Sequence, residues 1–265
     1  MNVEHLETIH DPRLAPYGDL TGKRGHPDAG ILIAESRFLV ERLLASTLAV
    51  ESILVDNPAK VPDLPPGREA TPIFCLPRPQ LQKLVGFNFH RGVMACGRRP
   101  DLTDLRQVAW PDQERLTLSV AAQVVDPENL GSLIRASSAF GADALLVDDR
   151  CGDPFSRRAL RVSTGHAFKI PIVVATDLLE QLENAKSLGF QLIATALDET
   201  ATPLKKETVR DPRAALLFGN EGFGLDADVL EIADRRVTIP MERGSDSLNV
   251  AMAAGVFLYH YCYML

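Results

Sequence analysis

Runs of apolar residues alternate with amphipathic segments along most of the chain after residue 110. Short runs rich in valine, isoleucine and leucine predict strands, and apolar residues three or four positions apart predict helices. The expected strands are RLTLSVAAQVV (115–125), ADALLVDD (142–149), KIPIVVA (169–175), FQLIATAL (190–197), AALLF (214–218) and RVTIPM (236–241). The expected helices are NLGSLIRASSAFG (129–141), FSRRALRVSTG (155–165), DLLEQLENAKSLG (177–189), DADVLEIA (226–233) and the apolar segment 250–263. This alternation predicts an α/β fold, a mostly parallel sheet with helices on both faces.

The chain before residue 110 predicts a smaller α/β unit. An irregular arm is expected to about Ala29, followed by helical spacing from Phe38 to Leu44 and a strand at VESILVD (50–56). A strand, a helix and a strand are then expected at ATPIFCLP (70–77), RPQLQKLVG (78–86) and RGVMACG (91–97). The polar stretch GRRPDLTDLRQVAWPDQER contains two prolines and places the boundary near residue 110. Two domains are therefore predicted, 1–110 and 111–265.

The composition is that of a globular protein and argues against several classes. Of 265 residues, 46% are hydrophobic and 24% charged, which is ordinary for a folded domain. No apolar run approaches the ~20 residues of a membrane span, and the first residues are polar rather than a signal peptide. The four cysteines form no CxxC pair and the six histidines no HxxxH spacing, so neither structural zinc nor a disulfide framework is expected. A reducing, cytoplasmic location fits this cysteine usage.

The net charge of −7 is unevenly distributed along the chain. Residues 1–111 carry 13 Lys/Arg and 13 Asp/Glu, whereas residues 112–265 carry 15 and 22. A bound polyanion would therefore need a local basic patch rather than a basic protein. The first part contains the candidate residues for such a patch: Lys23, Arg24, Arg91, Arg98 and Arg99.

Three polar loops follow expected strands, and parallel sheets bind ligands outside the carboxyl ends of their strands. In the first loop, DPENLGSLIRASSAFG, Asn129 is expected to cap a helix that begins near Leu130, with Arg135 farther along that helix. A capped amphipathic helix with a solvated arginine explains this segment as well as a binding site does.

The second loop, FGNEGFGL, carries Gly219, Gly222 and Gly224 directly after an apolar strand. Glycines allow positive φ angles and close approach of a ligand to the backbone. The spacing is neither GxGxxG nor that of a Walker loop. Glu221 would repel a phosphate, so a neutral or cationic ligand fits better, and a plain tight turn remains the alternative.

The third loop lies in RVTIPMERGSDSLNVAMAAGVFLYH (236–260), between a strand and an apolar helix. Ser247 is the expected N-cap, which leaves Asn249 in the first turn, where asparagine is a poor helix former. A second cap or a solvated side chain would also explain Asn249. The helix Val250–Tyr263 is apolar nearly all round, which predicts burial on more than one face, with a partner subunit supplying the extra cover.

Taken in order, the three loops resemble the signature motifs of the SPOUT superfamily, specifically the SpoU/TrmH-type RNA ribose 2′-O-methyltransferases. The matching motifs are NLGSLIR with FG five residues on, LLFGNEGFGL, and IPM followed by SLNVAMAAGVFLY. The segment SRRALRVSTG is similar to the middle helix of that family, and the resemblance covers about residues 115–262. The segments LTGKRGHPDAGILIAESRFLVERLL and FHRGVMACG are more loosely similar to its ribosomal-protein-L30-like substrate-binding domain.

This resemblance implies a C-terminal trefoil knot, S-adenosylmethionine bound in the knot as cofactor, and a homodimer with its site near the interface. Matched by motif, the cofactor contacts are Thr195, Ala196, Gly219, Ile239 and Leu248. The polar catalytic set implied by the same motifs is Asn129, Arg135, Glu221, Ser247 and Asn249.

The resemblance also implies that Arg135 helps to deprotonate the ribose hydroxyl. Arginine is a poor base because its ordinary pKa exceeds 12. Arg135 would therefore have to act through phosphate contact, placement at a dimer interface or desolvation.

From this resemblance, the leading hypothesis is an RNA 2′-O-methyltransferase acting on rRNA or tRNA. The 2′-hydroxyl is the group that distinguishes RNA from DNA, and the basic residues of the first part are then the expected RNA contacts. A noncatalytic RNA-binding or assembly factor that keeps the fold is the first alternative. A module that binds an unrelated nucleotide is the second.

Overall fold

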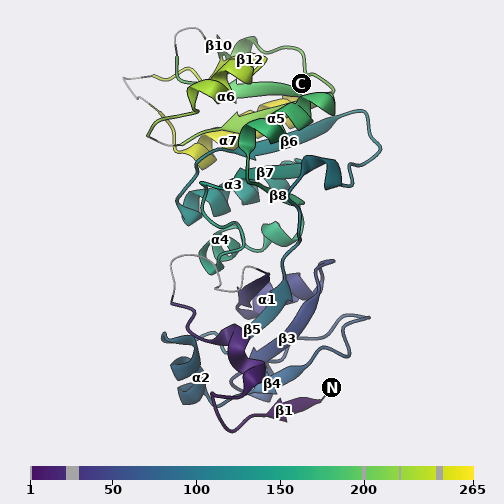
Figure 1. Cartoon of the computed structure of the whole chain (residues 1–265), viewed down its shortest axis with the longest axis vertical. Helices are drawn as coiled ribbons and strands as arrows, with labels where there is room; N and C mark the ends of the chain where they lie inside the picture. The colour runs from purple at the N-terminus through teal and green to yellow at the C-terminus, as the bar shows by residue number, and fades with distance from the viewer. Residues whose placement is uncertain (1, 22–29, 199–200, 221, 243–246) are drawn as a thin grey trace. The chain divides into compact units, whose positions relative to one another are not determined.

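The computed structural model describes residues 2–21, 30–198, 201–220, 222–242 and 247–265. The chain forms two compact units (Figure 1), one made of Met1–Asp101 with Phe155–Phe168 and the other of Leu102–Pro154 with Lys169–Leu265. The first junction between the two units lies at Asp101–Leu102, earlier than the expected boundary near residue 110. The reason is that Leu105 and Val108 are buried in the core of the second unit.

The second unit is built on a seven-stranded sheet in which every pair of neighbouring strands is parallel. The strand order is β10-β12-β9-β11-β6-β7-β8. The strands are β6 Leu116–Ala121, β7 Ala144–Asp148, β8 Ile172–Ala175, β9 Gln191–Thr195, β10 Thr202–Pro203, β11 Arg213–Phe218 and β12 Arg235–Thr238. All six longer strands were expected from the apolar runs, and the short edge strand β10 was not.

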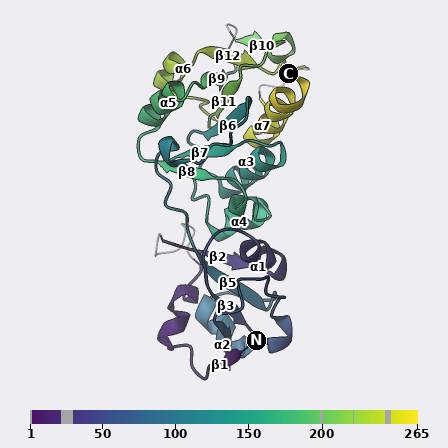
Figure 2. The same ribbon diagram turned by 90° about the vertical axis from the view of Figure 1, so that its right-hand side faces the viewer.

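Helices cover both faces of this sheet, as the alternation predicted. Figure 2 shows α5 and α6 on one face and α3 and α7 on the other. The helices are α3 Pro127–Ala139, α5 Leu178–Ser187, α6 Ala227–Ile232 and α7 Val250–Tyr259, which continues as a π-helical turn over His260–Met264. Two short 3-10 turns lie at Leu105–Gln107 and Leu204–Lys206. Within the described residues, no helix is long and apolar enough to span a membrane.

The starts of two helices differ from expectation. Helix α3 is capped by Asp126, whose carboxylate accepts the Glu128 N–H at 2.7 Å, so Asn129 lies inside the first turn. Helix α7 is capped by Asn249, whose Oδ1 accepts the Ala251 N–H at 3.0 Å, so Ser247 lies before the helix. In both places two polar residues competed for one cap, and local preference did not decide between them. Asp177 caps α5, the helix expected over 177–189, and its carboxylate accepts the Glu180 N–H at 3.1 Å.

The first unit is a five-stranded mixed sheet in the order β1-β4-β3-β5-β2. Its strands are β1 Val3–His5, β2 Ile31–Glu35, β3 Val50–Val55, β4 Ile73–Cys75 and β5 Val93–Arg98. Its helices are α1 Arg37–Leu44, α2 Arg78–Val85 and α4 Arg157–Val162, with 3-10 turns at Pro12–Tyr17, Pro58–Lys60 and His166–Phe168. The arm expected to be irregular to about Ala29 therefore contains an edge strand paired with β4 and a helical turn.

Helix α4 belongs to the first unit although it was expected in the second domain. Arg157 donates to the Glu35 carboxylate and to the Leu20 carbonyl, each at 2.5 Å. Its guanidinium also lies 4.1 Å from the centre of the Phe87 ring. These contacts attach the segment Phe155–Phe168 to β2 and its neighbours. Sequence pattern alone could not reveal them, because the partners lie 70 to 137 residues earlier.

Candidate cofactor and active site

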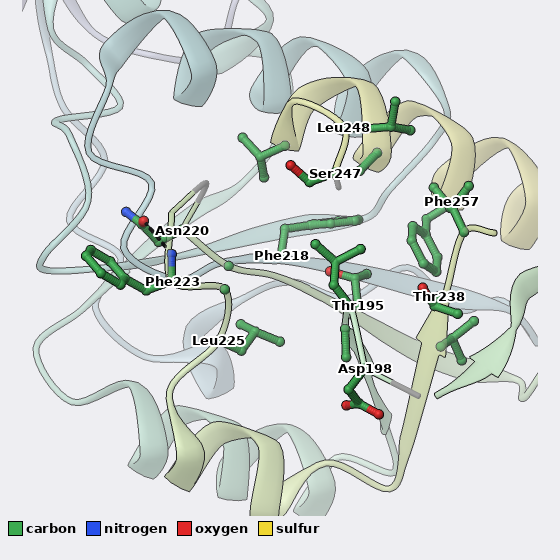
Figure 3. A pocket seen from close by; sticks show the side chains of 18 of the residues that line it. Thr195, Asp198, Phe218, Asn220, Phe223, Leu225, Thr238, Ser247, Leu248 and Phe257 are labelled. Carbon is green, nitrogen blue, oxygen red and sulfur yellow. Dashed lines mark hydrogen bonds between the residues drawn. The ribbon is translucent and has the colours of Figure 1, made fainter. Parts of the chain in front are cut away.

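A cavity of about 440 Å³ lies at the carboxyl ends of β9, β11 and β12 (Figure 3). This is the edge where parallel sheets bind ligands, and the volume is in the range of small-molecule sites. The lining residues after β9 are Thr195, Ala196, Leu197 and Asp198. Those from β11 and its loop are Phe218, Gly219, Asn220, Gly222, Phe223, Gly224 and Leu225, with Leu230 of α6. The rest of the wall comes from β12, α7 and the chain between them: Val237, Thr238, Ile239, Met241, Ser247, Leu248, Val250, Ala253 and Phe257.

One wall is the glycine loop, defined as Gly219–Asn220 with Gly222–Leu225. Asn220 and Gly224 exchange two backbone hydrogen bonds of 2.9 Å, which draws the two sides of the loop together. A Cβ atom on Gly219 would lie 2.4 Å from the Gly224 carbonyl, so only glycine fits there. Gly224 has a φ of 73°, in the left-handed region that favours glycine. The loop is therefore closely packed rather than a loose turn.

Asn220 holds this loop in place through its side chain. Its Oδ1 accepts the Gly222 N–H at 2.8 Å and the Phe223 N–H at 3.2 Å. Its Nδ2 donates to the Gln123 carbonyl at 3.0 Å, which ties the loop to the end of β6. The side chain thus satisfies backbone groups on both strand ends and leaves little freedom in the loop.

The remaining walls are mostly apolar. Leu225, Leu248 and Phe257 present hydrocarbon surface, and Figure 3 shows Thr195 and Asp198 along the lower part of the cavity. Thr195 Oγ1 donates to the Leu217 carbonyl at 2.8 Å, so its hydroxyl proton is already used. The half-buried Asp198 adds a carboxylate that lies 3.8 Å from the Arg236 guanidinium and can also accept hydrogen bonds from a hydroxyl or an ammonium group. The cavity suits a flat apolar ring system with a few polar groups.

The starts of α3 and α7 meet through two asparagines. Asn249 Nδ2 donates to Asn129 Oδ1 at 2.8 Å. Since Asn249 Oδ1 already accepts the Ala251 N–H, only its amide nitrogen is available for Asn129. Ser247, two residues before Asn249, lines the cavity. The pair therefore places polar groups from two distant segments next to the wall formed by Ser247 and Leu248.

The five residues expected to contact a cofactor, Thr195, Ala196, Gly219, Ile239 and Leu248, all line this cavity. The expected polar set is more dispersed. Ser247 lines the cavity, and Asn129 and Asn249 pair with each other. Arg135 is exposed on α3 and is not among the lining residues. Glu221 lies outside the described residues.

The expected RNA-binding residues differ in their availability. Lys23 and Arg24 lie outside the described residues. Arg91 is exposed. Arg98 pairs with Glu51 at 2.5 Å, and the half-buried Arg99 donates to the Ile31 carbonyl at 2.6 Å. The last two side chains are therefore partly committed to contacts within the first unit.

Several lining residues were not singled out from the sequence. Asn220 and Phe223 belong to the motif FGNEGFGL, in which the sequence had indicated only the glycines and Glu221 as site residues. Asp198 directly follows the expected strand 190–197, so its strand-end position was the available signal. Thr238 lies inside the expected strand 236–241 and became a strand end only because β12 stops at Thr238. An Asx turn at Asn220 was also readable, since asparagine commonly bonds to backbone two residues on.

A second hollow lies at the carboxyl ends of β7 and β8 and is strongly acidic. Its lining includes Asp148, Asp149, Arg150, Asp177, Asp226 and Asp228. Arg150 pairs with Asp148 at 2.8 Å and with Asp226 at 2.9 Å. These two carboxylates raise the pKa of the Arg150 guanidinium. Among the residues that the structure describes, no group of three or more His, Cys, Asp or Glu side chains is arranged to hold a metal ion.

A family model described as the SpoU rRNA Methylase family matches residues 117–259, which include the glycine loop and the Asn129–Asn249 pair. The chain belongs to this family. A relative from Mycobacterium bovis, named as an uncharacterized tRNA/rRNA methyltransferase, is 37% identical over 267 residues, covering 98% of this chain and 91% of the relative. The match to this family bears out the resemblance drawn from the three loop motifs.

Two further proteins are similar to this chain over nearly its whole length. The Bacillus subtilis protein named 23S rRNA (guanosine(2553)-2′-O)-methyltransferase RlmP is 30% identical, covering 97% of this chain and 99% of RlmP. The crystal structure of an AdoMet-bound rRNA methyltransferase from Sinorhizobium meliloti has a TM-score of 0.84 at 24% identity, covering 99% and 98% of the two chains. That structure shows the same fold over nearly the whole length.

Proposed function

We propose that this SpoU-family chain is an enzyme that transfers a methyl group from S-adenosylmethionine to a ribose 2′-hydroxyl of rRNA or tRNA. The observation that carries the proposal is the glycine-lined cavity at the ends of β9, β11 and β12, next to the Asn129–Asn249 pair. The printed names of the relatives support it: one acts on a guanosine 2′-hydroxyl of 23S rRNA and another is described with AdoMet bound. They favour an enzyme over a noncatalytic assembly factor.

The cavity fits S-adenosylmethionine in shape and in chemistry. Apolar side chains such as Leu225 and Leu248 can enclose the adenine, and the bare backbone at Gly219 permits close approach. Thr195, Ala196 and Ile239 contribute the strand ends that hold the adenosine. The carboxylate of Asp198 suits the cationic or hydroxyl-bearing part of the ligand. When bound, this cofactor supplies an electrophilic methyl group on a sulfonium.

The polar set positions the ribose for attack. A 2′-hydroxyl must be held in line with the methyl group, and its proton must be accepted as the new C–O bond forms. Asn129, Ser247 and Asn249 provide hydroxyl and amide groups for this positioning. Glu221 is assigned to the loop side of the same site.

Arg135 acts from an exposed position on α3. Because it does not line the cavity of its own chain, we assign it to contact with the RNA backbone at the interface with a second subunit. A guanidinium binds phosphate oxygens with two parallel hydrogen bonds. Such a contact would orient the ribose without requiring arginine to act as the base.

The proposal includes a trefoil knot at the C-terminal end of the fold. Strand β12 lies beside β9, whereas α7 packs against α3 on the far side of β11. The connection from Thr238 at the end of β12 to Val250 at the start of α7 therefore joins the two sides of β11. Threading of the C-terminal segment through an earlier loop of the chain, as in the trefoil knot that the resemblance implies, would hold the walls of the cavity together.

The proposal also includes a homodimer. Met252, Val256, Tyr259 and Tyr263 form an exposed stripe along α7 with helical spacing. The Phe140 ring packs edge-on against both tyrosines, with centroids 6.2 Å apart in each case. The opposite side of α7, including Phe257 and Leu258, is buried in its own chain. A second copy would cover the stripe, which is otherwise costly to expose.

RNA contact outside the active site is assigned to the first unit. The protein is proposed to act in the cytoplasm. The proposed contacts are Lys23, Arg24, Arg91, Arg98 and Arg99. Reversing the charges of Lys23, Arg24 and Arg91 together should weaken RNA binding while S-adenosylmethionine affinity stays near wild type. Equal loss of both would contradict this division between the units.

Two measurements test the activity. Calorimetry with S-adenosylmethionine, ATP and NAD should show binding of the first alone, which separates this proposal from another nucleotide-binding role. Mass spectrometry of RNA nucleosides from cells with and without the protein should reveal one 2′-O-methylated nucleoside that depends on it. Purified protein should restore that nucleoside in RNA from the deficient cells. Cofactor binding without any such difference in RNA would contradict the enzymatic role.

A further inference from the structure

Phe223 is an exposed aromatic side chain at the rim of the cavity. Its relative exposure is 92%, the highest among the large apolar residues in the described part of the chain. It borders the cavity, and Figure 3 shows its ring at the outer end of the glycine loop, directed away from Thr195 and Leu225. The aromatic face is therefore presented outward, next to the opening.

The glycine loop imposes this exposure. The Phe223 N–H is bonded to Asn220 Oδ1 at 3.2 Å, and the paired backbone bonds between Asn220 and Gly224 flank the residue on both sides. The close packing of Gly219 against Gly224 holds together the two sides of the loop that carries Phe223. A fully exposed phenyl ring is unfavourable in water, so a function for it at this position requires an external partner.

We propose that the Phe223 ring stacks on the base of an RNA nucleotide, either the one whose ribose is methylated or its direct neighbour. This inference rests on the proposed function, because it assigns the ring to the RNA substrate of the same site. RNA is read largely through unstacked bases that pack on aromatic side chains. A base taken out of its own stack to expose its ribose gains a replacement surface on Phe223.

The position of the ring favours RNA over the cofactor and over a second subunit as the partner of Phe223. A residue enclosing the cofactor would point into the cavity, as Leu225 and Phe257 do, and Phe223 does not. A residue of the proposed dimer contact would belong to the exposed stripe on α7. Since a phenyl ring has no hydrogen-bonding group, it holds the base in place without selecting which base it is.

The experiment compares F223A, F223L and F223W with the wild type. The RNA is total RNA from cells lacking the protein, and tritium transfer from S-adenosylmethionine gives initial rates at a series of RNA concentrations. Filter retention of the same RNA, labelled separately at its ends with phosphorus-32, gives affinity without any chemistry. V209A, at another exposed apolar residue outside the cavity, is the control. Thermal unfolding of each variant checks the fold, which should be unaffected because the ring makes little contact.

Stacking of one base on an aromatic side chain corresponds to roughly 5- to 150-fold in binding. F223A and F223L should weaken RNA binding and raise the KM for RNA by an amount in that range, with cofactor affinity unchanged. F223W should retain wild-type behaviour, and its added indole fluorescence should be quenched when RNA binds. V209A should match the wild type throughout.

Other results would overturn the assignment in distinct ways. Wild-type RNA affinity in F223A, or in F223L, would exclude aromatic stacking. A loss of S-adenosylmethionine affinity in F223A would place the ring in the cofactor site, and a change in sedimentation would place it in a subunit interface. If the wild type transfers no methyl group, the proposed function fails, and the filter-binding series still decides whether Phe223 contacts RNA.

Discussion

Asn249 joins the first turn of α7 to the first turn of α3 by donating a 2.8 Å hydrogen bond to Asn129. The same side chain caps α7 through Oδ1, so both of its polar atoms are engaged. One residue therefore links the stability of the last helix to the geometry of the proposed site. Substitutions at this position can separate the two contributions.

We expect N249S to keep the fold and lose activity. Serine replaces asparagine as an N-cap at little cost, whereas N249A should lose about 1 kcal/mol of unfolding free energy. Neither variant can reach Asn129, so methyl transfer should fall at least about tenfold in both. Urea unfolding and initial rates measured side by side decide the matter. Wild-type activity in N249S would show that the Asn129 contact has no role in the reaction.

Gly219 and Gly222 provide a matched pair in one loop. A Cβ on Gly219 would meet the Gly224 carbonyl at 2.4 Å, whereas on Gly222 the nearest atom is Asn220 Oδ1 at 3.4 Å. G219A should therefore distort the cavity wall, costing about 1–3 kcal/mol and weakening S-adenosylmethionine binding measured by calorimetry. G222A should bind the cofactor nearly normally. Similar affinities in the two variants would contradict the close packing of this loop.

Arg135 should contribute to activity and not to cofactor binding or stability. R135A removes an exposed side chain, so the unfolding free energy should stay within about 0.5 kcal/mol of wild type. Loss of phosphate contact should lower kcat/KM for RNA by about 100-fold, the size of effect expected when a substrate is misplaced by about 1 Å. R135K should restore only part of the wild-type kcat/KM for RNA, because lysine lacks the paired donors of a guanidinium. Full activity of R135A in steady-state assays would remove this residue from the proposed site.

The exposed stripe on α7 should control the oligomeric state. V256E places a carboxylate among Met252, Tyr259 and Tyr263, where a second copy would have to bury it. Sedimentation at micromolar concentration should show a dimer for wild type and a monomer for V256E. L179E, at a partly exposed residue on α5, should remain a dimer. A monomeric wild type would contradict the proposed dimer.

Cys151 should be a protected thiol that makes stability depend on alkaline pH. Burial raises the pKa of Cys151 to about 12, and its sulfur contacts the Val124 N–H at 3.1 Å and the Ala121 carbonyl at 3.3 Å. The unfolded thiol ionises near its ordinary value of about 8.5. The folded chain therefore keeps a proton that the unfolded chain loses, so this contribution is complete below about pH 8.5 and declines towards pH 12.

The measurement compares wild type with C151A in urea at pH 8 and at pH 10.5. The unfolding free energy of the wild type should fall more steeply with pH, by up to about 1.4 kcal/mol per pH unit. Equal slopes would show that Cys151 does not titrate differently in the two states. Iodoacetamide should modify Cys151 slowly at pH 8 unless the chain is unfolded.

The sequence was most informative where periodicity was strong. The alternating strands and helices of the second unit, and the helix that begins after Asp177, followed from apolar spacing and capping preference. A site was expected where three polar loops follow strands of one parallel sheet, which brings their residues to the same edge. Two of these loops line the cavity, and the first meets the third through the Asn129–Asn249 hydrogen bond. The family match then confirmed the resemblance drawn from the order of those loops.

The features that escaped prediction depend on contacts between distant residues. Whether Asp126 or Asn129 caps α3 depends on where the chain leaves β6, and Asn249 gains its second role only because α3 lies alongside. The attachment of α4 to the first unit depends on Arg157 meeting Glu35. The strand β1 is only three residues long, too short for its alternation to stand out from a coil.

The wall formed by Ser247, Leu248 and α7 is the last part of the cavity to be synthesised. Asn129 precedes its partner Asn249 by 120 positions, which at about 5–20 residues per second corresponds to roughly 6–24 seconds of translation. The proposed RNA-contacting unit is complete once Phe168 has been synthesised, so a nascent chain would carry that unit before it could retain the proposed methyl donor. A polypeptide released between these two points would be expected to occupy RNA without modifying it.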